Sequence, residues 1–350
     1  MRLRFLATLA TGLLLTGWLS TAGALAQESG LSLKMGSAFP GQLPQLGTLG
    51  VGLSEKVARI SGGRLQLEFH EPNALLPPRE MFDAIAAGSL DAAWSTPGYW
   101  FDREPALALF SGVPFGPAAG EYAAWIYRGG GEQLMQEIYA RHGIRSMICG
   151  ITVPEAAGWF RKEIRTLADL KGLKMRIRGL GAAVMERLGV VPQVIEGADI
   201  YEALKRGTID AAEYSTPAID LGLGFHRVAK YYYFPGWHQQ STLFDLMLSE
   251  ARWQALDETR KAQLEIACGD NFREGLAQGE ATQSKALNEL EAKGVKTQRW
   301  PLPVLQALRA EWEAVAAELS DQDETFRKTY DSLQAFRRDF RLWKDLGYLR

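Results

Sequence analysis

The residues best suited to chemistry in this sequence are two cations, a carboxylate and a group of aromatic side chains within residues 174–240. Arg176 and Arg178 lie in a strand-like segment, and Glu213 follows the next expected helix and strand. The aromatic run at residues 231–237 closes the region. Guanidinium groups at strand ends, close to a carboxylate and aromatic walls, suit a cleft that holds a small organic anion. The region therefore indicates binding rather than catalysis.

Catalytic motifs do not stand out elsewhere. The four histidines, His70, His142, His226 and His238, lack the spacing of zinc ligands, and we interpret each as a surface or packed residue. The sequence has no Gly-x-Ser-x-Gly motif for a nucleophilic serine. An extracellular enzyme such as an α/β hydrolase is therefore the weaker hypothesis.

Composition limits the possible partners. The 350 residues include 39 Lys and Arg against 41 Asp and Glu, a formal net charge of −2, which does not indicate a nucleic-acid-binding surface. The chain is longer than one hydrophobic core usually supports, which favours two lobes. Cys149 and Cys268 are the only cysteines. One bridge is possible in an oxidising compartment, but two buried thiols are the interpretation we favour.

The first residues have the layout of a secretory signal peptide. Arg2 and Arg4 precede an apolar run at residues 5–19, and a small-x-small triplet ends at Ala26. The run is too short and wrongly flanked for a bilayer span, so a retained membrane anchor is the less favoured alternative. We therefore expect cleavage after Ala26 and a mature protein outside the cytoplasm.

Strand-like and helix-like segments alternate along the chain, which predicts an α/β fold with βαβ units and mainly parallel sheets. Hydrophobic alternation predicts strands at residues 31–35, 65–70 and 90–94. Residues 81–93 (MFDAIAAGSLDAA) are echoed at residues 200–212 (IYEALKRGTIDAA), each giving a short helix, a glycine exit and a strand. The echo indicates two lobes of similar construction, although shared Ala and Gly also arise by chance.

The remaining elements set the expected domain boundaries. We predict one helix over residues 121–141, a buried strand at 144–149, a crossover near 154–163, a returning strand at 243–248, and helical regions from Trp253 and from Pro303 onward. These segments divide the chain into a signal peptide (1–26), lobe I (27–151 and 243–300), lobe II (152–242) and a C-terminal helical region (301–350). Aromatic loops at residues 97–101, which include Tyr99, and at 110–116 either line an apolar ligand site or pack beneath a loop.

Four motifs resemble the periplasmic solute-binding proteins of tripartite ATP-independent periplasmic (TRAP) transporters, and in particular the branch that binds 2-oxo acids and related carboxylates. They are GWFRKEI at residues 158–164, LADLKGLKMR at 167–176, GTIDA at 207–211 and LGFHRVAKYYYFPGW at 223–237. The resemblance implies a two-lobed periplasmic binding protein fold with hinge crossings and long C-terminal helices. It also implies a small carboxylate ligand and membrane permease subunits as partners. A sensor-linked binding protein with the same lobes is the alternative.

The resemblance also assigns ligand contacts. It implies that Arg176 holds the ligand carboxylate through two parallel hydrogen bonds, a geometry that lysine does not offer. Arg178 lies two positions on and therefore on the same face of the strand. Glu155 falls on a ligand-contact position where related proteins of this branch carry glutamine. A carboxylate there repels a carboxylate ligand unless it is protonated or bridged by a cation, and the alternative is a solvated loop residue.

A cation site is also implied by the resemblance. Its ligands fall on the Glu213 carboxylate, the Tyr214 backbone carbonyl and the Gln239 amide oxygen, which are hard donors suited to sodium or calcium. Tyr214 stands where related proteins often have tryptophan, so its side chain is expected in the pocket wall. With Glu155 present as well, the charge count favours calcium over sodium.

An aromatic and aliphatic stripe recurs near the C-terminus. Its members are Trp312, Phe326, Tyr330, Leu333, Phe336, Phe340 and Trp343. Related proteins use a terminal helix to embrace a second subunit, which would make the chain a homodimer. Packing of the same stripe on the chain's own lobe explains it equally well.

Overall fold

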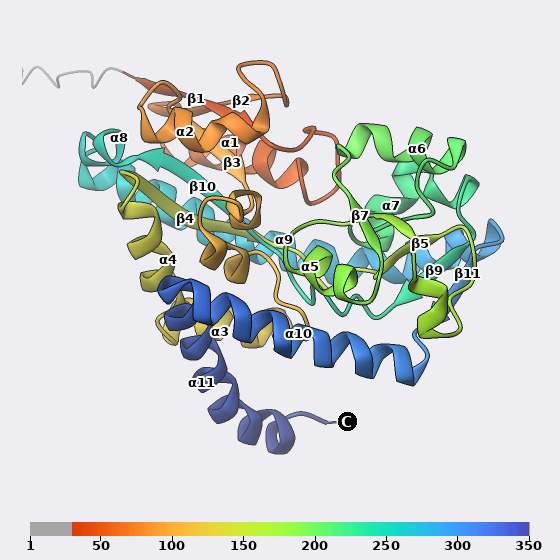
Figure 1. Cartoon of the computed structure of the whole chain (residues 1–350). Helices are drawn as coiled ribbons and strands as arrows, with labels where there is room; N and C mark the ends of the chain where they lie inside the picture. Colours follow the sequence, from red (N-terminus) through yellow and green to blue (C-terminus); the bar gives the residue numbers. More distant parts are fainter. Residues whose placement is uncertain (1–29, 350) are drawn as a thin grey trace, which may run out of the picture.

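The computed structural model describes residues 30–349, which form two lobes side by side (Figure 1). The first lobe is built on a five-stranded sheet of order β2-β1-β3-β10-β4, and the second on a six-stranded sheet of order β11-β9-β5-β8-β6-β7. The expected signal peptide, with its cut after Ala26, lies outside the described residues. Among the helices described, none combines the length and apolar character needed to cross a membrane.

The first sheet joins the start of the chain to a strand that returns from the second lobe. Its strands are β1 (Leu31–Ser37), β2 (Leu65–His70), β3 (Ala92–Ser95), β4 (Ile144–Ile151) and β10 (Leu243–Ser249). Strand β1 pairs in parallel with β2 and with β3, as expected for βαβ units, whereas β10 runs antiparallel to both β3 and β4. Every residue of β10 is buried, as expected for a strand that is paired on both sides within the sheet.

The second sheet is assembled from shorter strands. They are β5 (Gly158–Phe160), β6 (Lys174–Arg176), β7 (Val191–Gln193), β8 (Ala211–Ala212), β9 (Tyr231–Phe234) and β11 (Lys296–Arg299). Strand β6 pairs in parallel with β7 and β8, and β5 lies antiparallel between β8 and β9. Strand β11 pairs with β9, so this segment, which we placed in lobe I, belongs to the second sheet. The register with β9 decides its place, because a short polar strand can pair with either sheet.

The sequence echo corresponds to the same unit in each sheet. Helix α2 (Met81–Ala86) precedes β3, and helix α6 (Ile200–Arg206) precedes β8. Gly88 and Gly207 have φ values of 72° and 74°, the left-handed conformation that glycine adopts at a helix exit. Both units therefore direct the residues that follow β3 and β8 toward the space between the lobes.

Helices of very different lengths connect and cover the lobes. They include α1 (Thr48–Ile60), α5 (Gly179–Arg187), α7 (Pro217–Leu223), α8 (Glu250–Gln254), α9 (Glu258–Ala292), α10 (Leu302–Gln322) and α11 (Glu324–Gly347). Helix α9 packs on α1 and β4 of the first lobe and on α7 of the second, and Figure 1 shows it running behind both lobes. A Cβ at Gly275 would lie 2.8 Å from the Ile151 carbonyl oxygen, so glycine allows α9 to approach the crossing strand.

The helix predicted over residues 121–141 is two helices. Helix α3 (Ala119–Arg128) ends before α4 (Gly131–Ala140) begins. Gly130 has a φ of 86° between them, and such a left-handed residue cannot continue a right-handed helix. The prediction of one continuous helix was wrong because the glycine run was given too little weight.

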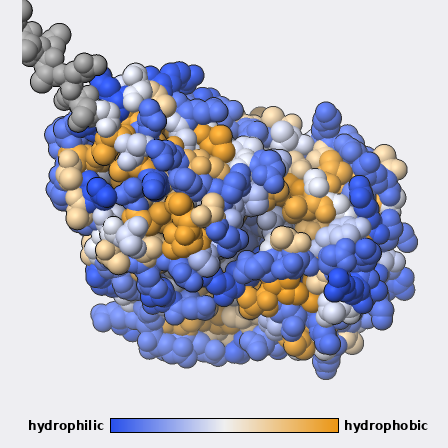
Figure 2. Space-filling model, turned by 90° about the horizontal axis from the view of Figure 1, so that it is seen from above, coloured by the Kyte–Doolittle hydropathy of each residue, from blue (hydrophilic) through white to orange (hydrophobic). Residues whose placement is uncertain are grey.

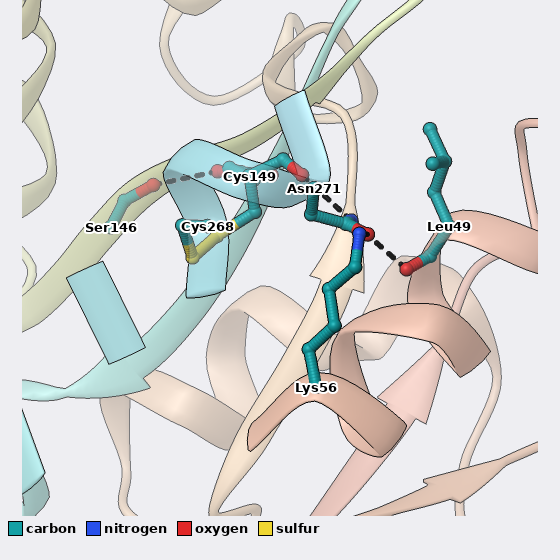
Figure 3. Close-up of a disulfide and its surroundings, with 7 residues drawn as sticks. Leu49, Lys56, Ser146, Cys149, Cys268 and Asn271 are labelled. Carbon is teal, nitrogen blue, oxygen red and sulfur yellow. Dashed lines mark hydrogen bonds between the residues drawn. A yellow bond between two sulfur atoms is a disulfide. The ribbon is translucent and has the colours of Figure 1, made fainter. Parts of the chain in front are cut away.

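The two cysteines are bridged, which corrects our prediction of two buried thiols. Cys149 on β4 and Cys268 on α9 form a disulfide across 119 residues of sequence (Figure 3). Beside it the buried Asn271 amide donates to the carbonyl oxygens of Leu49 (3.0 Å) and Cys149 (2.8 Å). The bridge and this amide fix α9 to the crossing end of the first sheet.

The C-terminal stripe divides into a buried part and an exposed part. Trp312, Phe326 and Leu333 are buried on the chain's own first lobe, where α11 packs on α3, α4 and α10. Trp343 is 59% exposed, and Leu342, Leu346 and Tyr348 are exposed with it. Figure 2 shows apolar patches on a surface that is otherwise mostly hydrophilic. The chain's own packing therefore explains the first half of the stripe only.

Candidate ligand and cation site

A cavity of about 500 Å³ lies between the lobes, and the residues predicted to bind ligand or metal all line it. They are Tyr99, Glu155, Arg176, Glu213, Tyr214 and Gln239. They come from segments up to 140 positions apart, so their proximity is a property of the fold. The cavity also includes Arg178 and His238.

Arg176 reaches the cavity from the carboxyl end of β6. Its Nη1 donates to the Glu213 carbonyl oxygen at 2.5 Å and to Glu213 Oε2 at 3.1 Å, and its Nε donates to the Ile195 carbonyl oxygen at 3.4 Å. Within the described residues Nη2 makes no hydrogen bond. The guanidinium lies 5.4 Å from the Tyr214 ring centroid. The protein therefore fixes Arg176 on one side and keeps one nitrogen for another acceptor.

Glu213 comes directly after β8, where its backbone N–H donates to the Arg176 carbonyl oxygen at 2.9 Å. Its two carboxylate oxygens face different partners, because Oε2 meets Arg176 whereas Oε1 lies 3.6 Å from His238 Nε2. Burial alone would raise the pKa of Glu213, but the facing His238 and Arg176 outweigh it and hold the pKa below its ordinary value. Glu213 is therefore an ionised carboxylate inside the protein.

Glu155 occupies the crossing segment and is also buried, at 4% exposed. Its Oε1 accepts hydrogen bonds from Thr242 Oγ1 (3.2 Å) and Ser215 Oγ (3.5 Å), and Oε2 has no hydrogen-bond partner in the described part of the chain. Burial and the nearby carboxylates of Glu213 and Asp220 raise the pKa of Glu155 well above its ordinary value. The alternative that Glu155 is a solvated loop residue is therefore wrong.

His238 is the site residue that the sequence interpretation missed. It is packed, as predicted, at 3% exposed, but its Nε2 points between the two glutamates, 3.6 Å from Glu213 Oε1 and 3.9 Å from Glu155 Oε2. Neither ring nitrogen has a hydrogen-bond partner among residues 30–349. The available signal was its position next to Gln239, since neighbouring residues of an irregular segment can both reach one cavity.

Gln239 is held in place from two sides. Its Nε2 donates to Thr242 Oγ1 at 2.8 Å, which leaves its amide oxygen as the remaining acceptor. A Cβ at Gly112 would lie 2.3 Å from Gln239 Cγ, so the glycine makes room for this side chain. Glycine is required here because of space rather than because of its backbone angles.

The donor set fits a cation. Ligand atoms of Glu155, Glu213 and His238 all lie within 4.8 Å of one another. The two carboxylates are buried, and the unpartnered Glu155 oxygen and His238 nitrogens have coordination positions to spare. Burying two carboxylates beside one guanidinium is costly without further positive charge or a proton. A cation at this cluster would be held by side chains already directed toward it.

Arg178 and Tyr99 form the rim of the cavity. Arg178 Nη2 pairs with Glu196 Oε1 at 3.0 Å, and Arg79 of the first lobe pairs with the same oxygen at 3.3 Å. The Arg178 guanidinium also lies 5.8 Å from the Tyr99 ring centroid. These contacts join the two lobes at the edge of the cavity, so Arg178 and Tyr99 are placed to enclose a ligand.

The aromatic loops contribute unequally. Tyr99 and Trp100, in the 3₁₀ turn Pro97–Trp100, line the cavity together with Phe39 and Phe244. Phe110 instead stacks on the buried Trp125, at 5.3 Å between ring centroids. The first loop is therefore an apolar wall of the site, and the aromatic side chains of the second loop serve mainly as packing.

Comparison with known proteins places this cavity in context. Residues 35–323 match the family described as "Bacterial extracellular solute-binding protein, family 7". Over 297 residues the chain is 35% identical to a monocarboxylate 2-oxoacid-binding periplasmic protein of Nostoc, an alignment that covers 85% of this chain and 82% of that protein.

Two solved structures are similar throughout. A TRAP transporter solute-binding protein from Bordetella bronchiseptica, a mixed-occupancy dimer with copurified calcium and picolinate, is 34% identical with a TM-score of 0.87, over 91% of this chain and 96% of that one. One from Pseudoalteromonas atlantica with bound sodium and pyruvate is 32% identical with a TM-score of 0.86, over 90% and 96%. The similarity therefore spans both lobes and the cavity between them.

Proposed function

The chain belongs to family 7 of the bacterial extracellular solute-binding proteins, and from this membership we propose that it captures a small monocarboxylate such as a 2-oxo acid. It is a solute-binding protein of the TRAP transporter type and not an enzyme. Its partners are then the ligand and the membrane permease subunits that receive it. In this proposal the protein binds its ligand in the periplasm, after removal of the signal peptide that ends at Ala26.

The observation that carries the proposal is the arrangement of charge in the cavity. Arg176 has one guanidinium nitrogen without an acceptor among residues 30–349, and it lies beside Glu213 and the wall formed by Tyr214 and Tyr99. A carboxylate can accept from that nitrogen, while an apolar tail faces the aromatic wall. Such a site selects small organic anions.

We further propose that the ligand binds together with a cation at Glu213, the Tyr214 carbonyl and Gln239. Similar proteins hold calcium with picolinate or sodium with pyruvate. The cavity has two buried glutamates, Glu155 and Glu213, so a divalent ion matches their charge better than sodium does. Glu155, in place of glutamine, then contacts the ligand through the cation rather than repelling it.

The test is a binding titration on purified protein that has been unfolded and refolded to remove copurified ligand. Pyruvate and picolinate are titrated by calorimetry with calcium, with sodium alone, and with a calcium chelator at low sodium. We expect binding in calcium that is lost in the chelator. Undiminished carboxylate binding in the chelator would refute the cation, and no binding of any carboxylate would refute the proposed function.

We propose that the exposed end of α11 binds a second copy of the chain. Its Leu342, Trp343 and Leu346 are exposed and continue the buried stripe, and the similar Bordetella protein is a dimer. Light scattering of the parent protein and of a Trp343→Asp variant measures the molecular mass in solution. We expect the parent to be a dimer and the variant to be a monomer, and a monomeric parent would refute the proposed dimer.

A further inference from the structure

The cluster of Glu155, Glu213 and His238 carries an inference about which cation the site prefers, and this inference rests on the cation site of the proposed function. Glu213 is the only member of the cluster that the family resemblance assigns to the cation. The other two add a carboxylate oxygen and an imidazole nitrogen. We propose that Glu155 and His238 are metal ligands together with Glu213, and that the site selects a divalent first-row transition-metal ion over calcium.

The first argument is that these donors are buried and unused. Glu155 is 4% and His238 3% exposed, yet Glu155 Oε2 and both His238 ring nitrogens have no hydrogen-bond partner within residues 30–349. Buried polar atoms are nearly always paired, and a bound ion is one of the ordinary reasons for an exception. Three unpaired atoms that can coordinate a metal, on two neighbouring side chains, therefore indicate a bound metal ion.

The second argument is distance. His238 Nε2 lies 3.6 Å from Glu213 Oε1 and 3.9 Å from Glu155 Oε2, too far for hydrogen bonds. Two atoms bound to one ion at about 2.1 Å are about 3.4 Å apart at a tetrahedral angle and about 4.2 Å apart when they are opposite each other. Both of these separations fall within this interval, and the ligand atoms of all three side chains lie within 4.8 Å of one another, so an ion bound to His238 Nε2 is within reach of each carboxylate.

The third argument is donor chemistry. Calcium takes oxygen ligands, whereas imidazole suits zinc, copper, iron and nickel. A set of one nitrogen and two carboxylates therefore favours a transition-metal ion. Thr242 Oγ1 and Ser215 Oγ hold Glu155 Oε1, which directs Oε2 toward His238, and Arg176 holds Glu213 Oε2, which directs Oε1 there. These outer contacts orient both carboxylates, as is usual around metal ligands.

The charges in the site balance when the proposed ligand is bound. A divalent ion and Arg176 supply three positive charges, and Glu155, Glu213 and a monocarboxylate supply three negative charges. A closed, buried site is then neutral, which avoids the cost of burying unpaired charge. A carboxylate with a second donor next to it, such as a 2-oxo acid or picolinate, can complete the coordination of the ion.

The experiment is a metal titration of the full mature protein after chelator treatment and refolding. Calcium, zinc and cobalt(II) are titrated separately by calorimetry in metal-free buffer, with and without pyruvate, and the visible absorption of bound cobalt reports its ligands. We expect zinc and cobalt to bind at least about tenfold more tightly than calcium. Calcium binding as tight as zinc binding, in the parent protein, would overturn the proposal without need of any variant.

Variants then identify the donors. His238→Gln should weaken zinc and cobalt by at least about tenfold, alter the cobalt spectrum, and change calcium affinity by less than about threefold. His226→Gln, at a buried histidine of the Phe225–Arg227 turn outside the cavity, is the matched control and should change none of these. Unchanged cobalt affinity and spectrum in His238→Gln would remove His238 from the site.

Failure of this inference is distinct from failure of the proposed function. Pyruvate binding in calcium that is indifferent to His238 leaves the proposed function standing and overturns the transition-metal site. Zinc binding through His238 without any carboxylate binding supports the metal site and overturns the proposed function.

Discussion

Replacing Arg176 with lysine should weaken carboxylate binding strongly while the protein stays folded. In the structure the guanidinium serves two acceptors on Glu213 through Nη1 and a third on Ile195 through Nε, and Nη2 has no acceptor within the described residues. The expected contact through two parallel hydrogen bonds is therefore reduced to a contact through Nη2. A lysine ammonium retains the charge that pairs with Glu213 but carries its three donors on one atom, so it cannot hold Glu213 and also donate to a ligand carboxylate from the position of Nη2.

The magnitude follows from the hydrogen bonds that are lost. Each hydrogen bond between charged groups is worth about 1.5–3 kcal/mol, so losing the contact from Nη2 in a desolvated cavity costs about 1.5–3 kcal/mol. At about 1.4 kcal/mol for each factor of ten, Kd rises about 10- to 140-fold. The fold should survive, because the positive charge beside the buried Glu213 is kept.

Calorimetry with pyruvate in saturating calcium measures the change, and circular dichroism melting confirms that the variant is folded. Arg178→Lys is the matched control, since Arg178 lines the same cavity but is paired with Glu196 at the rim. We expect its affinity to change by less than about threefold. Unchanged affinity in a folded Arg176→Lys variant would show that Arg176 does not hold the ligand.

Three other predictions concern motion, the disulfide and a buried acid. The strands that cross between the lobes are joined by a 2.8 Å hydrogen bond from the Thr152 N–H to the Thr242 carbonyl oxygen. We expect the lobes to close by hinge bending there, so that adding pyruvate and calcium reduces the radius of gyration measured by small-angle scattering. An identical scattering profile with proven binding would contradict closure. Converting Cys149 and Cys268 to alanine should lower the free energy of unfolding by about 2–4 kcal/mol in denaturant titrations without changing pyruvate affinity, and equal stability would show that the bridge contributes nothing. Burial raises the pKa of Asp245 from 3.8 to about 6, so the folded state binds its proton more tightly and stability falls as pH rises from about 4 to about 6. This decrease in the free energy of unfolding is about 3 kcal/mol, and it should be absent in Asp245→Asn. A stability difference between parent and variant that does not change with pH would refute the raised pKa of Asp245.

Much of the site was accessible from the sequence because its residues lie in local motifs. Arg176 ends a strand after a Gly-Leu-Lys turn, and Glu213 follows the strand of the second echo unit, so each belongs to a segment whose conformation is set by near neighbours. The alternation of strands and helices also predicted the α/β lobes. Local propensity and hydrophobic period are enough for features of this kind.

Other features depended on contacts between distant segments. Strand β11 pairs with β9 rather than with the first sheet, and Cys268 meets Cys149 because α9 packs along β4. Neither pairing has a local signal, since a polar strand and a lone cysteine are compatible with several partners. The break between α3 and α4 is different, because the glycine run that causes it is visible in the sequence.

His238 shows most clearly what the tertiary structure alone decides. In the sequence it is one histidine without zinc-like spacing, 83 positions after Glu155 and 25 after Glu213. Folding places its Nε2 within 4 Å of an oxygen of each glutamate and removes all three side chains from water. Contiguous motifs were enough to predict the family, the two lobes and the presence of Arg176 in the cavity. The meeting of these three side chains was decided by the folding of the second lobe, which brings together residues that no spacing rule connects.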